Sequence, residues 1–144
     1  MELRIRVERV EGAPIVPLPA RATEGSAGFD VRSAEAIRLT RGRIDLVRTG
    51  LRMTAPPGTF LEVRPRSGLS SRGVLMVNAP GTVDRDYAGE IKVPLTYLFD
   101  GEFEIGIGDR IAQMRLVVDP AAEFVEGVVV PTPGRTGGFG STGR

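Results

Sequence analysis

The chain carries the stretch Gly81-Thr82-Val83-Asp84-Arg85-Asp86-Tyr87-Ala88-Gly89-Glu90. Its aspartates and glycines are residues typical of tight turns. The pattern predicts a hairpin with its tip near Arg85–Gly89. In an extended chain Asp84 and Asp86 would point to one face, where their carboxylates could bind a cation or an arginine. The alternative is an ordinary solvated turn.

The rest of the chain shows the same β signal. Apolar and charged residues alternate over residues 3–8, which is the period of a half-buried strand. One short helix is expected at Gly68–Arg72, since no long stretch shows a helical apolar period. Short strands bounded by turn residues predict an all-β sandwich, barrel or jelly roll. Further strands are expected at Ile44–Met53, Thr59–Val63, Val74–Val77, Glu90–Phe99, Ile111–Val118 and Phe124–Val130.

The composition restricts the possible chemistry. The 144 residues include no His, Cys or Trp, and the net charge is +1. These absences exclude disulfides, thiol nucleophiles, His-based triads and zinc sites built on Cys or His. Acid–base chemistry is therefore left to carboxylates, Tyr or the single lysine, Lys92. The charge gives no reason to expect binding to nucleic acid or a membrane. Because no apolar run could span a membrane, a cytoplasmic protein is expected.

Other short segments could also carry chemistry. Arg66 and Ser67 stand where a strand leads into a helix start, an arrangement that can bind an anion or simply cap a turn. Asp30 enters one expected strand and Gln113 interrupts another. We expect one domain over residues 1–130, followed by a mobile tail over 131–144. The tail is rich in glycine, which suggests a flap that closes on a ligand.

Five segments, in this order, resemble the trimeric-type dUTP pyrophosphatases, or dUTPases. The third and fifth are the most specific, and together the five extend over nearly the whole chain. The segments are AGFDV at 27–31, PRSGLSSRG at 65–73, GTVDRDYAGE at 81–90, GDRIAQ at 108–113 and GGFGSTG at 137–143.

The resemblance implies a jelly-roll-like or β-clip subunit that hydrolyses dUTP to dUMP and pyrophosphate. This activity keeps uracil out of DNA and supplies dUMP for thymidylate synthesis. Asp84 occupies the position of the carboxylate that deprotonates the attacking water, consistent with the absence of His. Tyr87 matches the aromatic residue that packs under deoxyribose and excludes a 2′-hydroxyl. Mg²⁺ is expected on the triphosphate, with Asp30 as a weak contact through water.

The resemblance also assigns the binding residues. The backbone of the predicted hairpin would pair with the uracil edge, and one phosphate motif would hold the phosphates. In the tail, Phe139 would stack on uracil, and the Arg of the family motif stands one residue closer to the glycines here. The expected uracil contacts are Asn78, Gly81, Thr82, Val83 and Lys92. The expected phosphate contacts are Arg66, Ser67, Gly68, Gln113, Arg135, Gly140, Ser141 and Thr142.

In this family the active form is a homotrimer whose sites are shared between subunits. Two other functions fit parts of the same pattern. One is a dCTP deaminase, a related fold with a similar phosphate motif, for which Glu90 would be the carboxylate near the base. The other is a non-catalytic dUTP-binding regulator. The Asp-x-Asp-Tyr segment at 84–87 and the tail motif favour the hydrolase.

Overall fold

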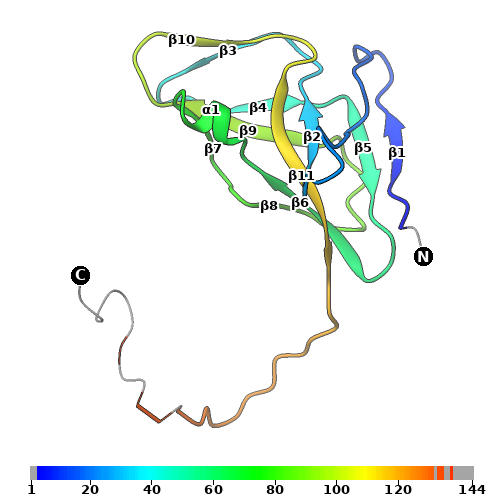
Figure 1. The fold of residues 1–144 in the computed structure, drawn as a ribbon, viewed down its shortest axis with the longest axis vertical. Helices are drawn as coiled ribbons and strands as arrows, with labels where there is room; N and C mark the ends of the chain where they lie inside the picture. Colours follow the sequence, from blue (N-terminus) through cyan, green and yellow to red (C-terminus); the bar gives the residue numbers. More distant parts are fainter. Residues whose placement is uncertain (1–2, 132, 135–136, 138–144) are drawn as a thin grey trace.

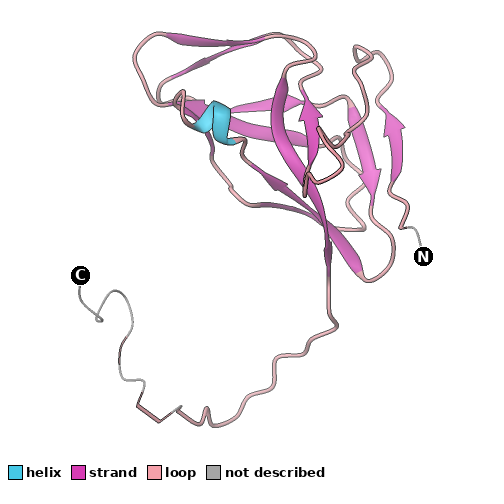
Figure 2. Ribbon diagram, in the orientation of Figure 1, coloured by secondary structure: helices cyan, strands magenta, loops and turns pink. Residues whose placement is uncertain are grey.

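The computed structural model describes residues 3–131, 133, 134 and 137, and this part of the chain is almost entirely β (Figures 1 and 2). The predicted all-β class is confirmed. The short helix begins at Ser67, close to its predicted place. The elements are β1 (Arg6–Arg9), β2 (Phe29–Arg32), β3 (Ile37–Thr40), β4 (Asp45–Arg48), β5 (Leu51–Thr54), β6 (Thr59–Arg64), α1 (Ser67–Ser70), β7 (Val74–Met76), β8 (Gly81–Val83), β9 (Lys92–Tyr97), β10 (Glu102–Ile105) and β11 (Arg110–Val118).

The strands form four antiparallel sheets. The largest has the order β2-β11-β6-β8, and a second has the order β4-β9-β7. Two further sheets are the pairs β10-β3 and β1-β5. Within the described part of the chain, the strand pairs do not join these sheets into a closed barrel.

The alternation of apolar residues in the strands builds one core. In β5, Leu51 and Met53 are buried while their neighbours are exposed, and β6 and β9 follow the same period. Successive side chains of a strand point to opposite faces, so these three strands contribute every second residue to the core. The fully buried large side chains include Leu39, Leu51, Leu61, Leu95, Ile111 and Met114.

Gly50 divides the predicted strand Ile44–Met53 into β4 and β5. Its φ of +67° lies in the left-handed region, which favours glycine. A Cβ atom at Gly50 would lie 3.1 Å from the Cβ atoms of both Ala13 and Ala34. The chain therefore turns sharply at Gly50, and β4 and β5 enter different sheets.

The predicted hairpin around 81–90 is wrong in its pairing. β8 pairs with β6, whereas β9 pairs with β4 and β7. Residues 84–91 therefore link two sheets instead of closing a tight turn. The segment is longer than the short loops that favour hairpins, and pairing with β6 places Val83 opposite the buried Leu61.

The predicted strand Phe124–Val130 is also wrong. The segment 119–131 has no helix or strand and leaves the body of the molecule (Figure 1). A strand needs a neighbouring strand for its backbone hydrogen bonds, and this chain places none beside the segment. The described part of the chain contains no helix of the length and apolarity needed to cross a membrane. The large apolar side chains of the segment 119–131 that are exposed include Phe124, Val125, Val128, Val129 and Val130.

Candidate functional site

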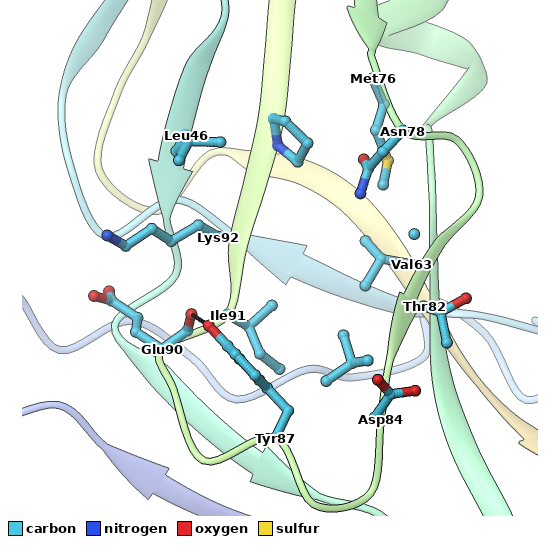
Figure 3. Close-up of a pocket in the computed structure, with 13 residues that line it drawn as sticks. Leu46, Val63, Met76, Asn78, Thr82, Asp84, Tyr87, Glu90, Ile91 and Lys92 are labelled. Atoms are coloured by element: carbon cyan, nitrogen blue, oxygen red, sulfur yellow. Dashed lines mark hydrogen bonds between the residues drawn. The ribbon is translucent and has the colours of Figure 1, made fainter.

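A cavity of about 500 Å³ lies between β8 and the start of β9 (Figure 3). The separation of these two strands into different sheets makes the space. Seven predicted site residues line the cavity: Asn78, Gly81, Thr82, Val83, Asp84, Tyr87 and Lys92. The other lining residues are Leu46, Val63, Met76, Glu90, Ile91 and Pro94.

The cavity offers main-chain groups along one wall. Among the strands that the structure describes, β8 is the last of its sheet, and its edge opposite β6 has no strand partner. Residues Gly81–Val83 run along the cavity at this edge (Figure 3). Across the cavity, Lys92 and Val93 pair with β4, and no described residue pairs with them on their other side. An unpaired edge carries N–H and C=O groups in a fixed order, which a planar ring with amide groups can match.

Asn78 and Gly81 pack closely at one end of the cavity. A Cβ atom added to Gly81 would lie 2.9 Å from Asn78 Nδ2 and 3.1 Å from Met76 Cε. Position 81 therefore requires glycine if the amide keeps its place. The Asn78 side chain points into the cavity above Val63 (Figure 3).

Tyr87 forms the opposite end. Its hydroxyl donates a hydrogen bond to the main-chain oxygen of Glu90 at 3.0 Å, and its N–H donates to the Asp84 main-chain oxygen at 3.1 Å. A Cβ atom at Gly89 would overlap the Tyr87 hydroxyl. The ring is thus held across the loop while 47% of the residue stays exposed.

Asp84 is exposed and stands beside Tyr87, with its carboxylate directed toward the cavity (Figure 3). Among the residues that the structure describes, no side-chain hydrogen bond or ion pair occupies this carboxylate. It is therefore free to accept a proton or a hydrogen bond from a bound molecule.

A second group of predicted residues surrounds Asp30. Arg66 Nε lies 3.4 Å from Asp30 Oδ1, and Arg110 Nη1 lies 3.3 Å from Asp30 Oδ2. Arg66 also donates from Nη1 to the main-chain oxygen of Arg110 at 3.1 Å. The Asp30 side chain is 10% exposed, and its Oδ1 and the Arg66 Nε have no hydrogen-bond partner among the described residues. The paired charges fix the guanidinium group of Arg66 at the start of α1.

Ser67, Gly68 and Gln113 belong to the same region. The first N–H groups of a helix have no partner within it, so those of Ser67 and Gly68 are available to an anion. Gln113 pairs in register with Asp30 in β2 and Arg64 in β6. Its side chain packs on Gly28, where an added Cβ atom would lie 3.3 Å from the Gln113 Cβ.

One chain therefore does not bring all the predicted residues together. None of the residues around Asp30 lines the cavity between β8 and β9. The sequence reasoning missed Arg48, which binds Glu90 across 42 residues of sequence. No local pattern could have revealed a pair so far apart in the chain. Five predicted tail residues lie outside the described residues: Arg135, Phe139, Gly140, Ser141 and Thr142.

The described acidic residues are not arranged to hold a magnesium ion by themselves, but they are compatible with an ion that binds together with substrate phosphates. No group of three or more His, Cys, Asp or Glu residues gathers in the part of the chain that the structure describes. The Asp30 carboxylate already faces two guanidinium groups. Mg²⁺ usually keeps several waters and binds one or two carboxylates together with substrate phosphates.

The sequence matches known proteins over nearly its full length. A family model described as dUTPase matches residues 15–143. A deoxyuridine 5′-triphosphate nucleotidohydrolase of Anaeromyxobacter sp. (strain Fw109-5) is 46% identical over 149 aligned positions, covering 100% of both chains. The enzyme of the same name from Helicobacter pylori (strain J99) is 41% identical over 143 positions, covering 98% of this chain and 97% of the relative.

Solved structures agree with the fold. The dUTPase from Streptococcus mutans superimposes with a TM-score of 0.76 at 25% identity, covering 82% of this chain and 98% of that one. A Staphylococcus bacteriophage 80alpha dUTPase with dUPNHPP gives a TM-score of 0.80 at 23% identity, covering 97% and 98%. With the match to residues 15–143 and the relatives above 40% identity, these findings show that the chain belongs to the dUTPase family.

Proposed function

We propose that this chain hydrolyses dUTP to dUMP and pyrophosphate. The observation that carries the proposal is the arrangement of the cavity, where an unoccupied carboxylate, an anchored tyrosine and an open strand edge meet. The carboxylate supplies a general base, and the tyrosine ring packs against the deoxyribose. The strand edge supplies hydrogen-bonding groups for the uracil ring.

The strand edge supports recognition of uracil. β8 and Lys92 line the cavity from two sides, and Asn78 adds a side-chain amide. Uracil presents alternating carbonyl and N–H groups, whereas cytosine carries an amino group at position 4. A fixed main-chain pattern matched to uracil leaves groups unpaired when cytosine binds, which costs affinity.

Tyr87 supports selection of the deoxy sugar. Its ring is fixed by the bond to the Glu90 main-chain oxygen and has no space to move toward Gly89. A rigid ring under the sugar leaves no room for a 2′-hydroxyl. This steric exclusion would allow the site to discriminate between dUTP and UTP.

Asp84 is the base in the proposed reaction. Its carboxylate accepts a proton from a water molecule as the water oxygen attacks the α-phosphorus. A new P–O bond forms, the bond from the α-phosphorus to the bridging oxygen breaks, and pyrophosphate leaves with that oxygen. The exposure of the carboxylate, and the lack of a side-chain partner for it among the described residues, support this role.

Arg66, Ser67, Gly68 and Gln113 are proposed to hold the phosphates. Bound Mg²⁺ would neutralise charge on the triphosphate. Asp30 is proposed to contact this ion through a water molecule. The direct partners of Asp30 are arginines, so its stronger effect is to orient Arg66.

A homotrimer with shared sites would explain why the two groups lie apart in one chain. The proposed base and the proposed phosphate residues would then come from different subunits. The apolar side chains exposed along 119–131 support assembly, because such a run favours burial against another copy. We further propose that residues 131–144 close over the bound nucleotide, with Phe139 on uracil and Arg135 on the γ-phosphate.

The structure gives no support to a deaminase. The Glu90 carboxylate, the candidate for that chemistry, is engaged by the Arg48 guanidinium and the Gly50 N–H. The hydrolase is tested by measuring pyrophosphate release from dUTP, dTTP, dCTP and UTP, each with and without Mg²⁺. We expect release from dUTP alone and only with Mg²⁺. Ammonia release from dCTP without pyrophosphate from dUTP would overturn the proposal.

A further inference from the structure

We propose that Glu90, held by Arg48, is a positioning residue that sets the rejection of ribonucleotides. The inference rests on the proposed function. It goes beyond that function because it states that the Arg48–Glu90 ion pair fixes the position of the Tyr87 ring. Neither Glu90 nor Arg48 needs to touch the reacting atoms for this role.

The Glu90 carboxylate accepts hydrogen bonds from two groups. Arg48 Nε donates to both carboxylate oxygens at 3.1 Å, and the Gly50 N–H donates to Oε1 at 2.9 Å. The Glu90 side chain is only 13% exposed. A carboxylate with three such bonds in a half-buried place has little freedom to rotate.

The residue after Glu90 is held by the same segment. Thr49 donates from Oγ1 to the Ile91 main-chain oxygen at 2.6 Å, and its N–H reaches the same oxygen at 3.3 Å. The Ile91 N–H donates to the Leu51 main-chain oxygen at 2.9 Å. We call residues 48–51 the clamp. The clamp fixes both the side chain of Glu90 and the peptide that follows it.

The fixed peptide aims the Glu90 main-chain oxygen at Tyr87. That oxygen accepts the 3.0 Å hydrogen bond from the Tyr87 hydroxyl. The Glu90 side chain extends to the opposite side from Asn78 and Thr82, whereas the Tyr87 ring runs from the loop toward the Glu90 main-chain oxygen (Figure 3). The clamp thus acts on the ring through the Glu90 backbone.

The chain provides a matched control on the same strand as Arg48. Arg43 donates from Nε to Asp45 Oδ2 at 3.0 Å, and the Asp45 side chain is also 13% exposed. Asp45 does not line the cavity. Replacing Asp45 with asparagine should weaken a similar ion pair without moving Tyr87.

The test compares kcat/KM for dUTP with kcat/KM for UTP in the full chain and in Glu90→Gln, Arg48→Met, Tyr87→Phe and Asp45→Asn. Glu90→Gln keeps the shape of the side chain but removes its charge. We expect the first three variants to lower the dUTP-to-UTP ratio by about tenfold, because each removes or weakens a hydrogen bond that holds the Tyr87 ring. Asp45→Asn should leave the ratio unchanged.

The double variant Glu90→Gln, Tyr87→Phe decides whether the effect passes through the Tyr87 hydroxyl. If it does, the double variant lowers the ratio no further than Tyr87→Phe alone. Thermal unfolding is measured in parallel. A lower Tm with an unchanged ratio in Glu90→Gln and Arg48→Met would overturn the proposal, as would fully additive effects.

A binding measurement separates this inference from the proposed function. Calorimetric titration with non-hydrolysable α,β-imido analogues of dUTP and UTP gives the affinity ratio without turnover. If the unaltered chain releases no pyrophosphate from dUTP, the proposed function fails, and the affinity ratio still tests the clamp. If the unaltered chain is active and selective but the variants are equally selective, only the clamp fails.

Discussion

Arg66 Nε and Asp30 Oδ1 face each other at 3.4 Å in a buried site beside the start of α1. The pair joins two segments that are far apart in sequence, and it is the contact that orients the proposed phosphate-binding arginine. Breaking one member of a buried pair leaves the other charge uncompensated.

We therefore expect Asp30→Asn to weaken phosphate binding more than it slows the chemical step. The KM for dUTP should rise by about tenfold or more, because Arg66 and Arg110 lose their shared anion. Steady-state kinetics checks this, with Asp100→Asn as the control for an exposed ion pair. An unchanged KM with a lower Mg²⁺ affinity would instead favour a role for Asp30 at the metal.

Asp84→Asn should lower turnover by orders of magnitude while leaving the fold and nucleotide binding intact. The substitution keeps the size of the side chain and removes only its basic oxygen. We expect kcat to fall by about 10²–10⁴, the usual contribution of a positioned base. Rapid-quench measurement of dUMP formation, together with titration of a dUTP analogue, separates the two effects. Near-normal turnover would contradict the assignment.

Gly89→Ala should disturb Tyr87 directly. A methyl group at this position overlaps the tyrosine hydroxyl, so the ring or the loop must shift. We expect a lower dUTP-to-UTP ratio in kcat/KM and a lower kcat for dUTP, since Tyr87 is bonded to the Asp84 main chain. Gly25→Ala is the control, because a Cβ atom there meets nothing within 4 Å. Equal behaviour of the two variants would show that the loop adapts freely.

Ending the chain after Val130 should remove most activity but leave the oligomer assembled. The truncation deletes the motif residues proposed to cover the nucleotide and retains the apolar segment 119–130. Pyrophosphate release and light scattering, measured on the same preparation, check both parts. Full turnover by the truncated chain would refute the proposed closure.

The sequence predicted the β class, because turn residues and alternating apolar residues are local signals. The resemblance to the dUTPase motifs, and not these local signals, pointed to seven of the residues that line the cavity. The sequence did not predict the pairing of β8 with β6, since the hairpin reading of 81–90 used only neighbouring residues. The contact of Arg48 with Glu90 was missed for the same reason. The strand predicted at Phe124–Val130 failed because β-branched residues favour a strand only where a partner strand exists.

Substitutions at Phe124 and Val128 test oligomer assembly, because they should have little effect on an isolated subunit. Both side chains are exposed, so replacing them with aspartate in an isolated subunit removes no contact and buries no charge. In an assembly that covers this segment, the same charges would be buried without partners, which is costly. We therefore expect Phe124→Asp with Val128→Asp to shift the protein toward monomer and lower activity in proportion. Sedimentation at several concentrations, with Glu126→Gln as a control in the same segment, measures the shift. An unchanged mass distribution would mean that residues 119–131 lie outside the subunit interface.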